Sequence, residues 1–245
     1  MRNSTITGNV GGAAGGILDD VAPTIVGSTV AGNSGSTGNV AGDATLTNSI
    51  LANGGAEGDC SGTIDATNSL IDDTTDCTIT GTGNVTDQPA KLGALKANGG
   101  PTETMALLGG SPARDAGDLA TCPTTDQRGV HRPQGAGCDI GAYEVPHPAV
   151  FKPSASVVHQ TQFTVAWRIP GGGPGAAFFD VRYRDRPAGG GPFGAFHSLL
   201  DHTTARHASF IAPQFGLQFC FSARAVDAGG TTSPFGPEHC VKVRH

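Results

Sequence analysis

The chain has 245 residues, 38 glycines, 37% hydrophobic residues and a formal net charge of −6. This length allows one large domain or two ordinary ones, each with a real core. The acidic balance argues against nucleic acid or an anionic membrane as partner, because both need concentrated Lys and Arg.

The composition changes near residue 146. Of the 14 aromatic residues, only Tyr143 precedes that point, and the net charge is −10 before it and +4 after it. Two segments with such different side chains are not expected to share one core. The sequence therefore predicts two domains, residues 1–145 and residues 149–245, both of the all-β class.

The first segment carries a weak repeat of 20 to 24 residues. Short strips rich in Thr, Ile and Val alternate with Gly and Asn, which favours stacked coils of a parallel β-solenoid over helices or a disordered linker. Stacking would align Ile25 with Leu46, and Val30 with Leu51 and Ile71. Asn48 and Asn68 occupy one repeat position and are expected to form a side-chain amide ladder. The repeated segments are Asn3–Ile6, Gly27–Val30, Asn48–Leu51 and Asn68–Ile71.

Residues 88–145 contain a series of short motifs: Leu92–Leu95, Asn98–Leu107, Gly110–Asp118, Thr125–Gly129 and Cys138–Glu144. They closely resemble the C-terminal signature of the choice-of-anchor Q domain of large bacterial surface proteins. The resemblance to this domain covers roughly residues 1–145 and is specific over the last fifty of them. The resemblance implies a right-handed, pectin-lyase-like parallel β-helix, export, and attachment through a variable C-terminal element. Arg114 departs from the family pattern, which usually has a small apolar residue there.

An open solenoid end exposes strand edges, so the signature is expected to form a cap over that end. Charged side chains would lock its loops through charge-assisted hydrogen bonds, as structural rather than catalytic groups. The cap residues are Asp115, Asp126, Arg128, Arg132 and Asp139.

Residues 149–245 alternate apolar and polar side chains in short runs, which is typical of an antiparallel β-sandwich. Four runs resemble strands B, C, F and G of a fibronectin type III domain, with Trp167 as the core tryptophan. They are Phe163–Trp167, Phe179–Asp185, Phe219–Gly229 and Cys240–Val243. The basic residues Arg182, Arg184 and Arg186 alternate as a solvated strand face would.

Six cysteines form three local couples: Cys60 with Cys77, Cys122 with Cys138, and Cys220 with Cys240. An even count without C-x-x-C spacing favours disulfides over zinc, and disulfides indicate an oxidising compartment. The polar stretch 1–20 has no signal-peptide core, and no run of 18 apolar residues predicts a membrane span. We expect a fragment of a longer exported protein, secreted or displayed at the cell surface.

Parallel β-helices also host polysaccharide lyases and hydrolases, which need clustered carboxylates, often with calcium. The candidate carbohydrate or calcium site is Asp72, Asp73 and Asp76, for which a solvated turn is the competing interpretation. No other catalytic group, metal ligand or cofactor motif is evident, and the Thr spacings do not form the regular array of an ice- or glycan-binding face. We expect no cofactor, and calcium at this cluster is the one alternative.

The sequence therefore predicts a non-catalytic exported protein with a structural or adhesive role, a rigid solenoid stalk joined to an interaction or spacer module. An extracellular glycan or another surface protein is the expected partner. The alternative is a polysaccharide-binding or polysaccharide-degrading β-helix protein. Fold analogy alone cannot decide between them.

Overall fold

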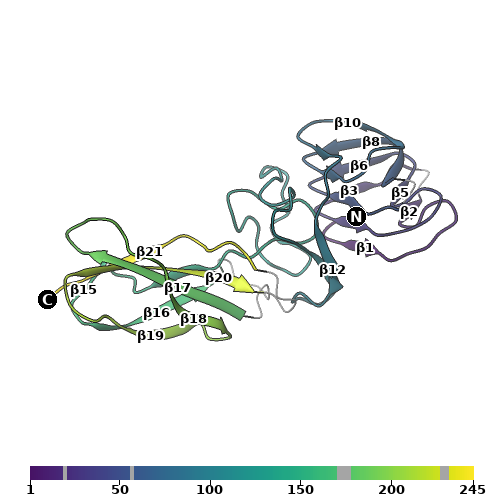
Figure 1. The fold of residues 1–245 in the computed structure, drawn as a ribbon. Coiled ribbons are helices and arrows are strands. Elements are labelled where there is room, and N and C mark those ends of the chain that lie inside the picture. The colour runs from purple at the N-terminus through teal and green to yellow at the C-terminus, as the bar shows by residue number, and fades with distance from the viewer. Residues whose placement is uncertain (19–20, 56–57, 170–177, 227–231) are drawn as a thin grey trace. The chain divides into compact units, whose positions relative to one another are not determined.

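The computed structural model describes residues 1–18, 21–55, 58–169, 178–226 and 232–245. The chain divides into two compact units, Met1–Val145 and Pro146–His245 (Figure 1). The described residues form strands, turns and irregular segments without a helix, so the all-β prediction is confirmed. Accordingly, these residues contain no helical segment of the length and apolar character that crossing a bilayer requires.

The first unit is a parallel β-solenoid. One sheet stacks a strand from each coil, in the order β1 (Thr5–Thr7), β4 (Thr29–Ala31), β7 (Ile50–Ala52), β9 (Leu70–Ile71) and β11 (Val85–Thr86). The long strand β8 (Cys60–Thr67) joins two further ladders. Its start pairs with β5 (Val40–Ala41), which pairs with β2 (Ile17–Leu18). The rest of β8 pairs with β6 (Ala44–Thr47), which continues to β3 (Thr24–Val26), and with β10 (Cys77–Thr80).

The aliphatic columns predicted from the repeat are confirmed. Ile25 pairs with Leu46, and Val30 pairs with Leu51, which pairs with Ile71. These five side chains belong to one buried cluster inside the coils. Only aliphatic and small residues contribute to it, because a narrow interior leaves no room for the aromatic rings that fill wider cores.

The repeated Ser positions form a ladder of hydrogen bonds from coil to coil. The backbone N–H of Ser4 donates to Oγ of Ser28, that of Ser28 to Oγ of Ser49, and that of Ser49 to Oγ of Ser69, at 3.1–3.2 Å. Each hydroxyl in turn donates to the carbonyl oxygen two residues before it, as Ser28 does to Val26. The repeat therefore satisfies buried turn backbone at every coil.

The residue before each ladder serine has a positive φ, which explains the Asn and Gly at this position. Asn3, Asn48 and Asn68 have φ of 47° to 48°, and Gly27 has 54°. The amide ladder expected between Asn48 and Asn68 is wrong: the Asn48 side chain instead holds Asp118 and Thr121 through Nδ2. Backbone conformation, and not amide stacking, selects the residue type here.

The segment that follows the coils, residues 88–145, lies along the side of the solenoid and is called the lateral cover below. The expected cap over the end of the solenoid is therefore wrong. Ile50 and Leu70, on the outer face of the first sheet, share a buried cluster with Leu107, Ile140 and Tyr143. Hydrogen bonds from this lateral cover reach three successive coils. They join Thr125 to Asn3, Ala142 to Thr29, and Asp118 to Asn48.

The end strands β10 and β11 each pair with only one neighbour among the described strands. The cover follows the sheet face because that face is apolar: in β7, Leu51 faces the interior while Ile50 and Ala52 face the cover. A sheet buried on both faces has a nearly continuous apolar sequence, as Ile50–Ala52 shows. The regular part of the cover is the antiparallel pair β12 (Leu92–Lys96) and β13 (Thr104–Leu107).

The second unit is a two-sheet arrangement around one aromatic core. One sheet has the order β14 (Ala149–Lys152), β16 (Gln162–Arg168) and β19 (His207–Ile211). The other has the order β15 (Val157–Val158), β21 (His239–Val243), β20 (Leu217–Val226), β17 (Phe178–Pro187) and β18 (His197–Thr203). All pairs are antiparallel except β15 with β21.

The four predicted sandwich strands correspond to β16, β17, β20 and β21. The last three pair side by side, and β16 belongs to the opposite sheet, as strands C, F, G and B do in immunoglobulin-like sandwiches. Trp167 is fully buried, as predicted. The predicted turn after strand F, residues 227–229, lies outside the described residues.

Candidate functional site

The largest group of buried charges lies in the lateral cover. The carboxylate of Asp126 accepts hydrogen bonds from Nε and Nη2 of Arg128 at 2.9 and 2.7 Å, and neither side chain is exposed to solvent. Arg128 also donates to the backbone carbonyls of Asn98 and Glu144, and its guanidinium stacks on the ring of Tyr143 at 3.6 Å. This ion pair meets the condition for a tolerated buried charge, since its remaining donors have partners.

A second buried group joins Arg132, Glu144 and Asp139. Nη1 of Arg132 lies 3.1 Å from Oε2 of Glu144, which also accepts the backbone N–H of Asp139. Asp139 accepts the N–H groups of Asp115 and Val145. Burial is the main cause that raises the pKa of Asp139 to about 6 and that of Glu144 to about 8, with mutual repulsion of the carboxylates adding to the rise for Glu144.

These contacts are tethers between loops. The five residues predicted to lock this segment, Asp115, Asp126, Arg128, Arg132 and Asp139, all bond to backbone groups of the cover. Four of them are buried, so a substrate has no contact with their charged atoms in this conformation. Sequence reasoning missed Glu144, although its position at the end of the Cys138–Glu144 motif was the available signal. Arg114 donates Nη2 to the carbonyl of Leu107.

A chain of polar side chains crosses the coils elsewhere. Nδ2 of Asn9 donates to Asn33, Nδ2 of Asn33 to Asn39, and Nδ2 of Asn39 to Oδ1 of Asp59, at 2.8–2.9 Å. Asp59 also accepts the N–H groups of Gly54 and Asp73, and its burial raises its pKa to about 6. Sequence reasoning missed this chain because its members do not share one repeat position. Asp59 is 0% exposed, so the chain supports the turns of the coils.

The candidate carbohydrate or calcium residues lie near one another, but their interactions are local. Oδ1 of Asp73 accepts the N–H and the hydroxyl of Thr75, and these bonds lower the pKa of Asp73. Burial raises the pKa of Asp72, and the backbone N–H groups of Ala90 and Asn53 oppose this rise. Asp76 is exposed. Their carboxylate oxygens do not form a group of three within 4.8 Å, so the calcium assignment gains no support.

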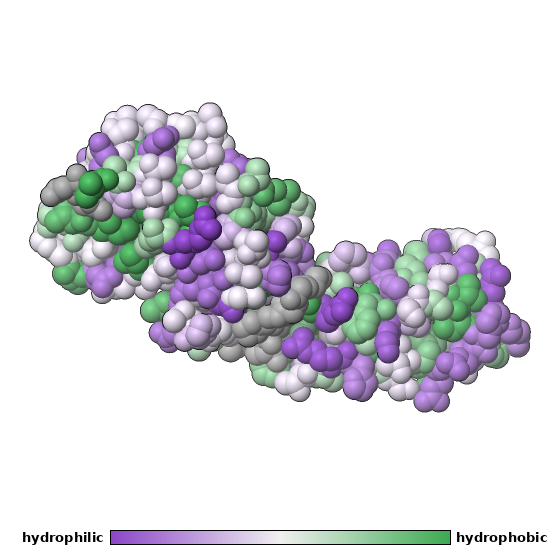
Figure 2. Space-filling model, turned by 180° about the vertical axis from the view of Figure 1, so that it is seen from behind, coloured by the Kyte–Doolittle hydropathy of each residue, from purple (hydrophilic) through white to green (hydrophobic). Residues whose placement is uncertain are grey.

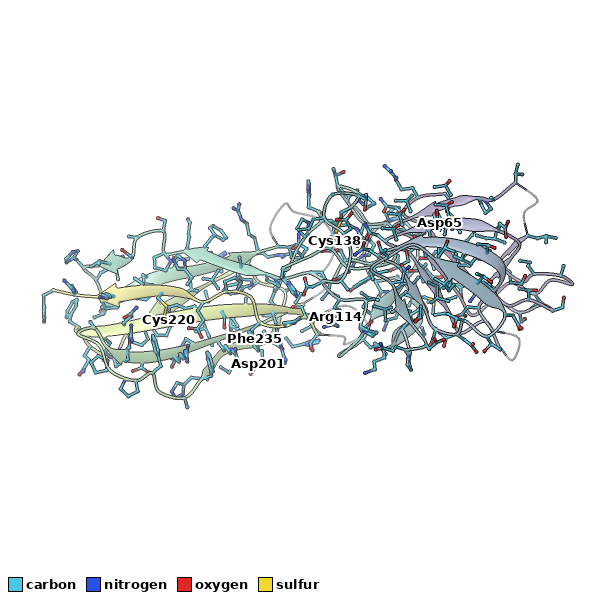
Figure 3. All side chains as sticks on the ribbon, turned by 90° about the horizontal axis from the view of Figure 1, so that it is seen from above. Asp65, Arg114, Cys138, Asp201, Cys220 and Phe235 are labelled. Carbon is cyan, nitrogen blue, oxygen red and sulfur yellow. A yellow bond between two sulfur atoms is a disulfide. The ribbon has the colours of Figure 1, made fainter. Side chains whose placement is uncertain are left out.

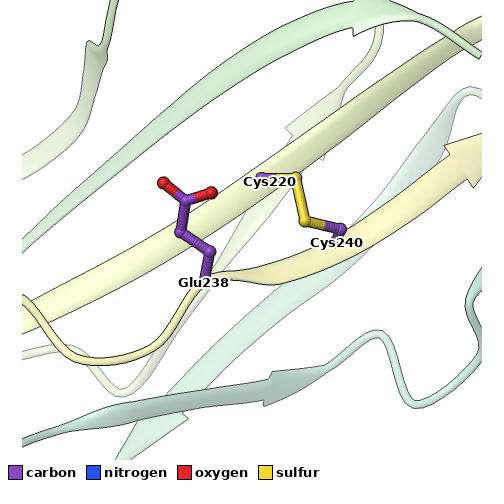
Figure 4. Close-up of side chains that lie close together, drawn as sticks. All are labelled: Cys220, Glu238 and Cys240. Carbon is purple, nitrogen blue, oxygen red and sulfur yellow. A yellow bond between two sulfur atoms is a disulfide. The ribbon is translucent and has the colours of Figure 1, made fainter. Parts of the chain in front are cut away.

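Each predicted cysteine couple is joined in the structure: Cys60–Cys77, Cys122–Cys138 and Cys220–Cys240. Cys220, Cys240 and Glu238 bring three potential metal ligands within 4.8 Å (Figure 4). The two sulfurs are bonded to each other and are not thiolates, and Glu238 pairs with Arg184 at 2.9 Å. The group therefore holds no metal ion while the disulfide is intact.

The outer face of β17 and β20 carries an alternating stack of guanidinium groups and phenyl rings. Its order is Arg224, Phe235, Arg182, Phe196, Arg184, Phe193 and Arg186. The distances from guanidinium carbon to ring centroid run from 3.7 to 5.0 Å. The prediction of a merely solvated strand face is therefore wrong, because the three phenylalanines come from outside the two strands and lie between the arginines.

Comparison with known proteins gives little further information. No family profile and no curated protein sequence matches the chain. Solved structures with local likeness include one described as a myokine (13% identity, 41% of this chain and 97% of that one, TM-score 0.29). Another is the fourth fibronectin type III domain of a human protein (16% identity, 40% of this chain and 77% of that one, TM-score 0.29). A third is the kinase region of twitchin from C. elegans (17% identity, 41% of this chain and 16% of that one, TM-score 0.27).

Proposed function

We propose that the chain is part of an exported cell-surface protein, with a structural or adhesive role and no catalysis of its own. The solenoid serves as a rigid spacer, and the sandwich serves as an interaction module. The observation that carries this proposal is the sheet β4–β7–β9, which packs apolar side chains on both faces. Such a sheet resists bending because interior packing is dense on either side of it.

The disulfides support export. Three disulfides in 245 residues suggest an oxidising environment, since reduced thiols prevail in the cytosol. The motifs of residues 88–145 resemble the choice-of-anchor Q domain, and we include that family, its right-handed β-helix and its surface attachment in the proposal. The buried Asp126–Arg128 and Arg132–Glu144 pairs support a structural role for these motifs, because their side chains bond backbone groups of other loops in the cover.

Surface exposure is tested on intact cells of the source organism. An antibody against the folded chain should label unpermeabilised cells, and brief external proteolysis should remove that signal. Non-reducing peptide mapping of protein taken from the same cells should find all three disulfides. The proposal would be contradicted by antibody labelling that appears only after cell lysis. Free thiols at Cys60 and Cys77 in protein taken from the cells would also contradict it.

The enzymatic alternative is tested on the purified chain. Acidic and neutral polysaccharides are incubated with it in the presence of calcium, and new chain ends are measured. The double variant Asp72→Ala, Asp73→Ala serves as the matched control. The proposal expects no cleavage by either protein. Cleavage by the wild type that the double variant lacks would establish the polysaccharide-degrading function instead.

A further inference from the structure

The alternating stack on the second unit places rings against the guanidinium groups and leaves the guanidinium edges to bond other groups. Its members are Arg224, Phe235, Arg182, Phe196, Arg184, Phe193 and Arg186. A ring covers a guanidinium on its face, whereas the N–H donors lie in the guanidinium plane and point outward from the stack. The structure shows what most of these edges bond. Arg184 donates to Glu238, Arg224 to Asp180, and Arg186 to Gln218 and to the carbonyl of Gly191.

Arg182 differs from its neighbours in the stack. The ring centroids of Phe196 and Phe235 both lie 3.7 Å from its guanidinium carbon, and its Nε donates to Ser222 at 3.2 Å. Its two terminal nitrogens donate to no described residue, and no carboxylate among the described residues lies within 4.0 Å of it. The rings hold a charged, planar donor in a fixed orientation without an anion to accept its hydrogen bonds.

The charge around Arg182 favours an anionic ligand. Cross-strand pairing places Arg182, Arg184, Arg186 and Arg224 on one face of the sheet, and Lys242 pairs with Gln218 on the same face. The carboxylates that bond these arginines are Asp180 and Glu238, so the face is cationic. The unit as a whole carries +4. Hydrophilic side chains are prominent over this unit in Figure 2, and Phe235 and Cys220 are labelled on it in Figure 3.

We propose that this face binds the carboxylate or sulfate groups of an anionic polysaccharide, with Arg182 as the central ligand. Guanidinium groups bind such anions through two parallel N–H donors. Alternate residues of a strand are about 6.6 Å apart, so Arg182, Arg184 and Arg186 present a regular row that suits a polymer with repeated charges. This inference rests on the proposed role of the sandwich as an interaction module and names the chemistry of its partner.

A polysaccharide fits this face better than nucleic acid does. Single-stranded nucleic acids bind through bases that stack on aromatic rings. Each ring of this stack already has two guanidinium carbons within 5.0 Å of its centroid, so a base that stacks on a ring would compete with these arginines. The disulfide Cys220–Cys240 joins β20, which carries Arg224 of the stack, to β21, and it suits an oxidising compartment.

The test measures binding of the full chain to polygalacturonate, heparin, neutral dextran and single-stranded DNA at two salt concentrations. The two acidic glycans distinguish carboxylate from sulfate. We expect binding to at least one of them that weakens as salt rises, and much weaker binding to dextran and DNA. Arg182→Gln should raise the dissociation constant about tenfold, the loss expected for a hydrogen-bonded charge. Arg182→Lys should give an intermediate loss, because it keeps the charge without the planar fork.

Arg206→Gln is the matched control, since Arg206 stacks on Phe179 at 4.3 Å and is not a member of the alternating stack. It should bind like the wild type, and Trp167 emission should show that each variant is folded. The inference is overturned by equal binding of dextran or DNA, by no binding of either acidic glycan, or by wild-type affinity of Arg182→Gln. If the antibody still labels the chain on intact cells, the proposed function remains valid although the polysaccharide-binding inference has failed.

Discussion

Arg128 shows how one side chain holds the lateral cover together. Its guanidinium bonds the carboxylate of Asp126 and two backbone carbonyls, all without exposure to solvent. Removal of one partner of such a pair leaves the other charge buried and uncompensated, which costs far more than the pair itself contributes.

Arg128→Ala should therefore lower the free energy of unfolding of the first unit by about 3–5 kcal/mol. Arg114→Ala is the matched control. Arg114 is only partly buried and donates one hydrogen bond, to Leu107, so its loss should cost about 1 kcal/mol. Urea denaturation followed by far-UV circular dichroism measures both values. Equal losses in the two variants would contradict the role assigned to Arg128.

The carboxylates of Asp139 and Glu144 make stability depend on pH. Burial raises their pKa values from 3.8 and 4.5 to about 6 and about 8. Between the ordinary and the raised pKa, the folded chain keeps protons that the unfolded chain has released. The free energy of unfolding therefore falls as pH rises from about 5 to about 8. Glu144→Gln, which carries no charge, should flatten this decline between pH 6 and pH 8; an unchanged slope would contradict the assignment.

The sequence identified the charged residues of the cover, but not their arrangement. Asp126 and Arg128 are close in the chain, so their pairing has a local signal. The contact of Asp118 with Asn48 spans 70 residues, and no local pattern encodes a contact of that range. The polar chain that ends at Asp59 was missed for another reason: its members occupy two different repeat positions, Asn9 and Asn33 one of them, and Asn39 and Asp59 the other.

At the level of elements, the coil is defined by its serine ladder and by the positive φ before each serine. Ser49 is buried, its Oγ accepts the backbone N–H of Ser28, and it donates to Thr47. Ser4 has the same sequence context, but among the described residues its hydroxyl bonds only the carbonyl oxygen of Arg2.

Ser49→Ala should lower the free energy of unfolding by about 1–3 kcal/mol, because it leaves the N–H of Ser28 buried without an acceptor. Ser4→Ala should change it by less than about 0.5 kcal/mol, as surface substitutions usually do. Urea denaturation of the two variants measures the difference. A neutral Ser49→Ala would show that the ladder contributes nothing to the stacking of coils.

The packing of the cover on β7 depends on Gly141. A Cβ at this position would lie 2.6 Å from Cδ1 of Ile50, and φ is +99°. Gly129 has a similar φ of +88°, but a Cβ there meets nothing within 4 Å. Gly141→Ala should therefore destabilise the first unit clearly more than Gly129→Ala does, with the clash added to the shared backbone strain. Equal midpoints in thermal denaturation would contradict the close contact.

The parallel ladders of the coils were predictable because the repeat fixes their register: each column needs only a shift of 20 to 24 residues along the chain. The position of the cover was not, because an apolar sheet face and an open solenoid end both require burial. The continuous apolar runs Ile50–Ala52 and Leu70–Ile71 were the signal that the sheet is covered on both faces.

At the scale of the whole molecule, two units with different cores account for the change in composition near residue 146. Aliphatic columns fill the first unit, while Trp167 and several phenylalanines fill the second. The boundary between Val145 and Pro146 lies where the sequence changes. The alternating Arg–Phe stack was not predictable, since residues from β17, from positions 193 and 196, and from position 235 meet only in the folded sandwich.

The central claim is that the first 145 residues form stacked coils whose main sheet is covered on both faces. Hydrogen–deuterium exchange with peptide-level mass spectrometry tests it most directly. Amides of β4, β7 and β9 should exchange slowest in this unit, and those of β10, whose side chains are partly exposed, should exchange sooner. Uniformly fast exchange across residues 1–145, or protection that is strongest in β10, would contradict the account.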